Sequence, residues 1–524
     1  MNKVTKGIIV ALSVIPGFGF AQTVTIDVKA DVHAISPYIY GSNEDCSFTT
    51  SARWGGNRST TFNWENNASN GGNDFNNVSD AFYDYTSSST PALPIVNFVK
   101  KADSRNQFKI VTVQAAGYVA ADKDGKVTEA ASDDNPRWKK ISFEKPTPYS
   151  LTPDTEDDVV YIDEMINYLQ TLGEPGNGGI DAYAVDNEPF LWSRSHPLLH
   201  PEQTTYQELF EKTKSVAHAV HKISPNAEIV GPMFYGWTDA HRWGSQQILD
   251  EIFAKNDSYY WFVDFYLDSL RQMQEKYGEK YLDIISFHWY PEATGTETRY
   301  SVGQKKGQLV RIVNTSVADA ATPAELVQPD VIEARLQAPR TLWDNTYKEN
   351  SYVGTEFYQI PKSRRAFLKN VRYSIDHYYP GTKIAFTEFE YDAEGHWSGG
   401  LALADVLGIF GREDVYLATK WNTFQNYSTS AYKLYLDYDG NGNGFGSTSV
   451  QDIFTDTVKL ASYASLDEEG NLHIIAINKT NAAMPTNFVL NNGVYSDGVV
   501  YGFGQNSADI KKLGTMDELF CDKS

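Results

Sequence analysis

Short apolar segments recur along the first 430 residues and alternate with longer amphipathic stretches. Their length and their content of β-branched and aromatic residues are typical of buried strands. The predicted strands cover residues 38–41, 52–55, 108–113, 182–185, 228–231, 284–287, 383–386 and 415–418. Between several of them the apolar residues follow helical spacing, as in 153–172, 203–223 and 249–277.

Eight alternations of strand and helix predict an α/β fold, a (β/α)8 TIM barrel. A doubly wound sheet is the alternative, but no glycine-rich phosphate loop follows the first strand. A barrel places functional groups just after its strands, at the C-terminal face. Polar or aromatic residues do follow most of the predicted strands, among them Asn43, Arg58, Gln114, Asp186, Glu188, His288, Tyr290, Glu388 and Trp421.

The pattern changes after Trp421, where short alternating segments are separated by Gly and Asn turns. They predict a second, smaller antiparallel β-sandwich domain with strands at 431–438, 459–466, 472–478, 487–490 and 499–503. The alternating segment 23–32 is expected to join it. The predicted divisions are 1–21, a signal peptide; 22–37, an N-terminal strand of the β domain; 38–430, the barrel; and 431–524, the β-sandwich. The polar loop 60–91 is expected to wall the cleft.

The N-terminus has the features of a signal peptide. Lys3 and Lys6 precede an apolar run, and small residues lead to a predicted cleavage after Ala21. The run is shorter than the roughly 20 residues of a membrane span, and no Cys follows the cleavage site. We therefore expect a secreted or periplasmic protein with no membrane partner. The two cysteines, Cys46 and Cys521, are too few for a metal site built from four thiolates, and whether they pair is left open.

Composition narrows the class of ligand. The net charge of −22 disfavours nucleic acid and anionic membranes, whereas a neutral polymer meets no such repulsion. Aromatic residues make up 14% of the chain, with 11 Trp and 33 Tyr. Flat amphipathic rings suit surfaces that stack on sugars, although a large aromatic core is an equally good explanation for any single ring.

Two glutamates carry the candidate chemistry. Cleavage of a glycosidic bond requires one carboxyl that delivers a proton and one that attacks the anomeric carbon. Glu188 ends the fourth predicted strand, where burial would raise its pKa and suit it as general acid/base. Glu388 ends the seventh strand and is the expected nucleophile. Asn187 is placed to bind a sugar 2-hydroxyl. A simple turn is the alternative for either segment.

Other residues near these strand ends are expected to support the pair. Tyr290 could orient Glu388, and His288 could hold Glu188 or substrate. Glu390 lies on the same side of its strand as Glu388 and could tune the site or bind substrate. The predicted substrate-binding set also includes five tryptophans, some of them expected to be core instead, and one glutamate: Trp64, Trp192, Trp289, Trp397, Trp421 and Glu65.

The motifs together resemble those of glycoside hydrolase family 44, retaining endo-β-1,4-glucanases and xyloglucanases with a barrel and a β-sandwich. They are Arg-Trp-Gly-Gly-Asn-Arg at 53–58, Phe-Asn-Trp-Glu-Asn-Asn-Ala-Ser-Asn at 62–70, Asp-Asn-Glu-Pro at 186–189, His-Trp-Tyr-Pro at 288–291 and Thr-Glu at 387–388. The resemblance implies that Glu188 is the acid/base and Glu388 the nucleophile. The chain departs from the family pattern at Phe389, where the resemblance would place Tyr.

The resemblance also bears on ions and partners. It implies that no cofactor is needed for catalysis and that a structural calcium is possible; the metal ligands stay unknown. Asp437, Asp439, Asn441 and Asn443 alternate in a Gly-rich turn as calcium ligands might, but the terminal Glu of an EF-hand is missing, so a plain turn is the alternative. The expected partner is a polysaccharide, bound by a monomer.

The function expected from the sequence is therefore endo-hydrolysis of β-1,4-glucan backbones, of the cellulose or xyloglucan type, by double displacement. Two alternatives stay open. A non-catalytic carbohydrate-binding protein would keep the aromatic residues without needing either glutamate. Another barrel glycosidase, acting on mannan or xylan, would share the carboxylates and differ in loops whose shape the sequence does not reveal.

Overall fold

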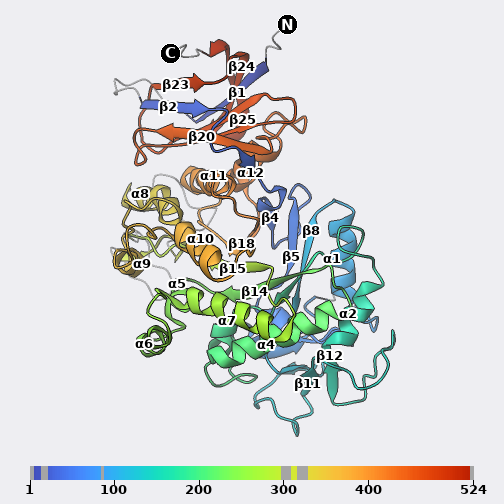
Figure 1. The fold of residues 1–524 in the computed structure, drawn as a ribbon. Coiled ribbons are helices and arrows are strands. Elements are labelled where there is room, and N and C mark those ends of the chain that lie inside the picture. The colour runs from blue at the N-terminus through green and yellow to red at the C-terminus, as the bar shows by residue number, and fades with distance from the viewer. Residues whose placement is uncertain are drawn as a thin grey trace.

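The structure, a computed structural model, describes residues 5–12, 22–83, 86, 88–296, 309–314 and 329–519. Figure 1 shows two parts, a barrel surrounded by helices and a β domain above it, with α11 and α12 between them. Among the described residues, no helix has the length and apolar character needed to cross a membrane.

The barrel is closed by eight parallel strands, which confirms the predicted (β/α)8 fold. In chain order they are β4 (Gly41–Ser42), β5 (Ser51–Trp54), β8 (Phe108–Val113), β13 (Ala182–Val185), β14 (Glu228–Phe234), β15 (Ile284–Trp289), β18 (Lys383–Phe389) and β19 (Leu417–Lys420). The predicted strand 38–41 is wrong in its first residues, because Pro37–Ile39 forms the 3-10 turn η1. Proline has no N–H to give to a strand ladder and fits the start of a turn.

Alternation along the strands separates the barrel interior from the layer under the helices. Ala182 and Ala184 point inward and form a small core with Ile110 and Met233. Tyr183, one residue over, belongs instead to the larger cluster beneath the helices. A strand with both faces buried reads as continuously apolar, which is why these segments stood out in the sequence.

Helices cover the outside of the barrel, and short elements fill its loops. The longer helices are α1 (Leu93–Asp103), α2 (Ile162–Gln170), α4 (Tyr206–His221), α6 (Gln246–Lys255), α7 (Phe262–Tyr277), α10 (Phe367–Tyr378), α11 (Trp397–Arg412) and α12 (Asn426–Leu436). The shorter ones are α3 (Trp192–Ser195), α5 (Trp237–Arg242), α8 (Pro329–Gln337), α9 (Tyr352–Phe357), η2 (Asn57–Thr61), η3 (Gly72–Phe75), η4 (Pro189–Leu191), η5 (Ile312–Asn314) and η8 (Ala338–Leu342). Loop strands are β6 (Ser69–Asn70), β7 (Val78–Asp80), β9 (Tyr118–Ala120), β10 (Gly125–Lys126), β11 (Trp138–Ser142), β12 (Val159–Tyr161), β16 (Thr294–Thr296) and β17 (Leu309–Arg311).

The second part is a nine-stranded sheet that wraps around its own apolar core. Its strands are β1 (Thr5–Leu12), β2 (Gln22–Asp27), β3 (His33–Ala34), β20 (Thr448–Phe454), β21 (Leu460–Leu466), β22 (Leu472–Asn478), β23 (Thr486–Asn491), β24 (Tyr495–Gly504) and β25 (Ser507–Leu519). The sheet is mainly antiparallel, but β2 pairs in parallel with β23, so the N-terminal segment is tied to the C-terminal one.

Two features differ from the sequence prediction or add to it. The predicted strand 431–438 is wrong, because residues up to Leu436 belong to α12. Ala431, Leu434 and Tyr435 are buried at helical spacing along one face. Residues 5–12, within the predicted signal peptide, form β1 between β22 and β24, parallel to both.

The two parts pack through α11. Tyr463 of β21 donates a hydrogen bond of 2.5 Å from its hydroxyl to the buried carboxylate of Asp405 in α11. A Cβ added at Gly408, one turn along the helix, would lie 2.2 Å from the Tyr463 ring. Glycine at 408 therefore sets the distance between the helix and the sheet.

We predict that Gly408→Ala lowers the melting temperature. In an open helix Ala would stabilise by up to about 1 kcal/mol, but here the added methyl overpacks the interface, at a cost of about 1–3 kcal/mol. The matched control is Gly411→Ala in the same helix, where the nearest atom, in Ile35, is at an ordinary 3.4 Å. Thermal unfolding followed by circular dichroism checks both variants; equal melting temperatures for the two would contradict the prediction.

Candidate active site

Glu188 lies at the mouth of the barrel on a strained turn. Strand β13 ends at Val185, and both Asp186 and Glu188 adopt the left-handed conformation, with φ of 55° and 45°. The buried Asp186 carboxylate holds this turn by accepting hydrogen bonds from Thr60 Oγ1 at 2.6 Å and the Ala115 and Asn187 N–H groups at 2.5 and 2.7 Å. Such backbone costs on the order of 1–3 kcal/mol per residue and persists where its surroundings enforce it.

Glu388 lies opposite, on the end of β18. Tyr290 donates a hydrogen bond from its hydroxyl to Glu388 Oε2 at 2.7 Å, and Arg53 donates one to Oε1 at 2.8 Å. The interpretation of Tyr290 as the residue that orients Glu388 agrees with this contact.

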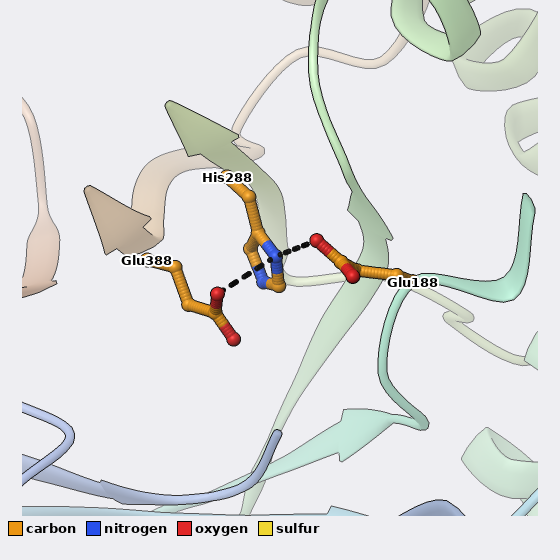
Figure 2. Close-up of side chains that lie close together, drawn as sticks. All are labelled: Glu188, His288 and Glu388. Atoms are coloured by element: carbon orange, nitrogen blue, oxygen red, sulfur yellow. Dashed lines mark hydrogen bonds and ion pairs between the residues drawn. The ribbon is translucent and has the colours of Figure 1, made fainter. Parts of the chain in front are cut away.

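His288 lies between the two glutamates, as Figure 2 shows. Its Nδ1 is 2.7 Å from Glu188 Oε1 and 3.4 Å from Glu388 Oε2. One oxygen of each carboxylate and one ring nitrogen lie within 4.8 Å of one another. In the strand register His288 of β15 is the direct neighbour of Glu388, so the sheet itself sets this spacing.

Arg53 is a site residue that the sequence analysis did not assign. It is buried in β5, and besides Glu388 it binds Asn187 Oδ1 at 2.6 Å and Asn43 Oδ1 at 3.0 Å. The signal was available: an arginine in a four-residue strand that is buried throughout needs a partner of opposite charge. Asn187 in turn donates to Asn57 Oδ1 at 2.9 Å.

The surroundings move the pKa values of the two glutamates in opposite directions. Burial raises the pKa of Glu188, His288 lowers it in part, and the negative charge of Glu388 adds to the increase. Burial would also raise the pKa of Glu388, but the charges of His288 and Arg53 and the hydrogen bonds from Arg53 and Tyr290 outweigh it, so the net shift is downward. Glu188 is thus suited to carry a proton and Glu388 to be an anion.

A cavity of about 360 Å³ opens next to the pair. Trp289, Tyr290 and Trp421, three of the predicted substrate-binding residues, line it, and their contact with substrate stays a prediction. Other residues that line the cavity were not predicted from the sequence. They follow β14 or β15 in the chain and include Tyr235, Trp237, Glu292, Arg311, Glu349 and Tyr352.

Three of the predicted substrate-binding residues are buried elsewhere. Trp64 is fully buried beside Tyr168, with ring centroids 5.6 Å apart, so it belongs to the core. Trp192 is also fully buried, and its Nε1 donates a hydrogen bond to the carbonyl of Asn187 at 3.2 Å, next to Glu188 in the chain. Glu65 is buried in an ion pair with Lys139 at 3.3 Å. The structure gives these three predictions no support, because none of the three is among the described residues that line the cavity.

Three further predictions keep an open outcome. Trp397 begins α11, its ring 5.2 Å from that of His396, and it is not among the described residues that line the cavity. In the turn proposed for calcium, Asp437 and Asp439 accept hydrogen bonds from Gly442, Asn441 and Asn443 of the same turn. Cys521, the suggested partner of Cys46, lies outside the described residues.

A carboxyl with a raised pKa that faces a carboxyl with a lowered pKa across a histidine, at the C-terminal mouth of a (β/α)8 barrel, is the arrangement of a barrel glycosidase. Comparison with known proteins makes the class more specific. The sequence profile of glycoside hydrolase family 44 matches residues 39–293.

Relatives match over nearly the whole chain. Endoglucanase A of Paenibacillus lautus is 41% identical over 93% of this chain and 68% of its own length. The β-mannanase/endoglucanase A of Caldicellulosiruptor saccharolyticus is 36% identical over 95% of this chain, which spans only 37% of that protein.

Solved structures agree with this assignment. A family 44 endoglucanase from Clostridium acetobutylium ATCC 824 superposes with a TM-score of 0.85 at 39% identity, covering 95% of this chain and 96% of that one. A Paenibacillus polymyxa xyloglucanase of the family, solved with xyloglucan, gives 0.85 at 37% identity, with 95% of each chain covered. The chain belongs to glycoside hydrolase family 44.

We predict that Arg53→Met shifts the bell-shaped pH profile of kcat/KM to higher pH. Arg53 lowers the pKa of both glutamates, so without it the acidic limb, set by Glu388, and the basic limb, set by Glu188, both move up. The loss of preorganised charge should also lower kcat/KM by about 10²–10³. Initial rates measured across pH check both effects.

The control is Arg364→Met, which removes an equally buried arginine paired with Asp264 at 2.8 Å. That variant should lose stability and keep the wild-type pH profile. An unshifted profile in Arg53→Met would show that Arg53 has only a structural role.

Proposed function

We propose that this protein hydrolyses β-1,4-glucan backbones internally and with net retention, with Glu188 as general acid/base and Glu388 as nucleophile. Glu188 protonates the glycosidic oxygen while Glu388 attacks the anomeric carbon, and a glycosyl-enzyme forms. Water, deprotonated by Glu188, then attacks the same carbon, and Glu388 leaves.

The separation of the two carboxylates carries this proposal. An oxygen of each lies within 4.8 Å of the other. Retaining glycosidases hold their carboxyl groups about 5–5.5 Å apart, whereas inverting enzymes leave about 6.5–9.5 Å for a water molecule. The opposite pKa shifts assign the roles, since only the acid/base must hold a proton at the start.

Neighbouring groups fit the roles required of them. Arg53 and Tyr290 hold the Glu388 carboxylate by one hydrogen bond to each of its oxygens, which favours its anionic form. Asn187, whose Oδ1 is held by Arg53, offers its amide next to Glu188, where a sugar 2-hydroxyl would lie. Trp289 and Trp421 supply apolar ring surface along the cavity for sugar faces.

The choice of substrate rests on the relatives. The family 44 proteins from P. lautus, C. acetobutylium and P. polymyxa are named endoglucanases or a xyloglucanase. The mannanase name of the C. saccharolyticus protein applies to a chain of which this one spans 37%, so it gives little support to mannan here. A non-catalytic binding role does not account for two carboxylates with opposite pKa shifts.

We predict that Glu188→Gln and Glu388→Gln each lower hydrolysis of carboxymethylcellulose and xyloglucan by at least about 10²–10⁴, the range of a positioned proton-transfer group. The control is Glu164→Gln, because Glu164 is a buried glutamate that is paired with Lys145 at 2.5 Å, outside the cavity. Reducing-sugar release on these substrates, mannan and xylan measures activity and ranks the substrates.

Azide separates the two roles on an aryl β-cellobioside. In Glu388→Gly, azide takes the place of the missing nucleophile, attacks the anomeric carbon of the bound substrate and gives an α-glycosyl azide. In Glu188→Ala, azide attacks the glycosyl-enzyme formed on Glu388 and gives the β-anomer. Proton NMR distinguishes the products. Inversion by the wild type, or the reverse pattern of azides, would reject the mechanism.

Location is a further part of the proposal. We propose export with cleavage after Ala21, on the basis of the basic and apolar N-terminal sequence. The full-length gene expressed in a Gram-negative host should then yield protein outside the cytoplasm with an intact mass that begins at Gln22. A mass that retains residues 5–12 would instead show that β1 persists in the folded enzyme.

Catalysis by this family needs no cofactor, since the proton and the nucleophile both come from side chains. Calcium binding by residues 437–443 stays a prediction, as does the monomeric state.

A further inference from the structure

Lys420 is a buried cation at the mouth of the barrel, on the end of β19. Its side chain has no exposed surface. The ammonium contacts Glu390 Oε2 at 2.9 Å, and it also forms an ion pair with Glu394. Fully burying a lysine is costly unless its charge is paired and its three donors are used.

The same ammonium also binds the chain that follows it. Nζ donates to the carbonyl of Trp421 at 2.7 Å and lies 3.2 Å from the carbonyl of Asn422 and 3.4 Å from that of Thr423. Asn422 adopts the left-handed conformation, φ 65°, so the backbone turns back over the lysine. This turn presents both Trp421 and Asn422 to the cavity.

Trp421 is also held from the other side. Gly56, after β5, has a φ of 90°, and a Cβ there would lie 3.0 Å from the edge of the Trp421 ring. The ring is thus packed against bare backbone on one side and anchored through Lys420 at its own carbonyl. Its position depends on these two contacts and on the hydrogen bond that its own backbone N–H donates to the carbonyl of Phe389 at 3.1 Å.

Glu390 lines the cavity two residues after Glu388. Its Oε1 accepts the N–H groups of Tyr391 and Asp392, both at 3.0 Å, and its Oε2 accepts from Lys420. A carboxylate has about four acceptor positions. Three are used within the described part of the protein, which leaves one for a ligand hydroxyl.

The positive charge of Lys420 acts on several carboxyl groups, those of Glu390, Glu394 and Asp392. Burial would lower the pKa of Lys420, but the charges of Glu390 and Glu394 outweigh it and raise the pKa. Burial and the charge of Glu390 raise the pKa of Glu394 to about 8 and that of Asp392 to about 7. Of these three carboxyl groups, Glu390 is the one that both contacts Lys420 and lines the cavity.

We propose that Lys420 is a positioning residue of the substrate cleft, which ties the Glu390 carboxylate to the Trp421–Asn422 turn so that a sugar hydroxyl and a sugar face are bound by one wall. The inference deepens the proposed function and rests on it. Glu390 is the substrate-contacting member, and Lys420 acts through Glu390 and Trp421.

The test compares Lys420→Met with Lys479→Met. Lys479 is equally buried and is paired with Asp405 at 2.5 Å, beneath the β domain. Both variants should lose thermal stability. Lys420→Met should also lower kcat/KM on cello-oligosaccharides by about 10²-fold, the effect of a misplaced binding wall, and should reduce the quenching of Trp fluorescence by bound oligosaccharide. Lys479→Met should keep the wild-type kcat, KM and quenching.

Glu390→Gln tests the contact directly. It is isosteric, and it should raise KM about tenfold with a smaller change in kcat, as expected for weakening one hydrogen bond to a charged acceptor. For Lys420→Ala, ethylammonium in the buffer should restore part of the lost kcat/KM by refilling the ammonium position, an effect that a purely structural lysine would not show.

The outcomes separate the two proposals. A wild type that does not hydrolyse glucans would overturn the proposed function. An active wild type whose Lys420→Met variant matches Lys479→Met in kcat, KM and quenching would overturn the positioning role alone. If Lys420→Met does not fold, Glu390→Gln decides: an unchanged KM overturns the proposal, and a raised KM supports it.

Discussion

The ion pair between Arg53 and Glu388 is the interaction on which the site depends. Glu188, which is partly exposed, and Glu388, which is buried, are the same residue type at the same barrel mouth, so desolvation alone would raise both pKa values. Among the described residues, a guanidinium forms an ion pair with Glu388 and none does so with Glu188. Two carboxylates this close cannot both ionise freely, and an asymmetric partner decides which one does. Arg53 and Tyr290, which both bond to Glu388, therefore distinguish the two carboxyl groups, and the proposed roles of acid/base and nucleophile rest on that difference.

The strands of the barrel fix the position of Arg53 next to Glu388. Arg53, His288 and Glu388 are carried by parallel strands whose register is set by backbone hydrogen bonds, so their distances do not rely on loops. Glu188 differs, because it lies just past its strand in the left-handed region. The cost of that conformation is offset by the three hydrogen bonds to the buried Asp186. The site thus combines a strained backbone turn at Glu188 with a rigid strand position at Glu388.

The sequence predicted the parts of the structure that depend on local pattern. Buried parallel strands are continuously apolar, so the barrel and the ends of β13, β15 and β18 could be placed, and with them Glu188, His288, Tyr290 and Glu388. The direction of a loop side chain is not a local property. Trp64 and Trp192 follow strands as Trp421 does, yet they are fully buried. Contacts with residues distant in the chain, such as that of Trp64 with Tyr168, determine where such a side chain packs.

Arg53 and α12 show the same limit in different ways. The partners of Arg53 lie 134 and 335 residues away in the chain, and only the closed sheet brings them together. For 431–438, aromatic and small apolar residues fit both strand and helix spacing, and packing of α12 against α11 and the β domain selects the helix. Local preference was ambiguous there, and tertiary contact settled it.

An acidic chain with a cleft rich in carboxyl groups depends on shared cations. Arg53 serves Glu388, Asn187 and Asn43, and Lys420 serves Glu390, Glu394 and the backbone of its own turn. Each cation thus fixes several polar groups at the mouth of the barrel, and these groups depend on the cation that they share for their orientation. Contributions of residues joined in this way do not add. The physical unit of this site is the cation with all of its acceptors: Arg53 with the groups around Glu388, and Lys420 with Glu390 and the Trp421–Asn422 turn of the proposed substrate wall.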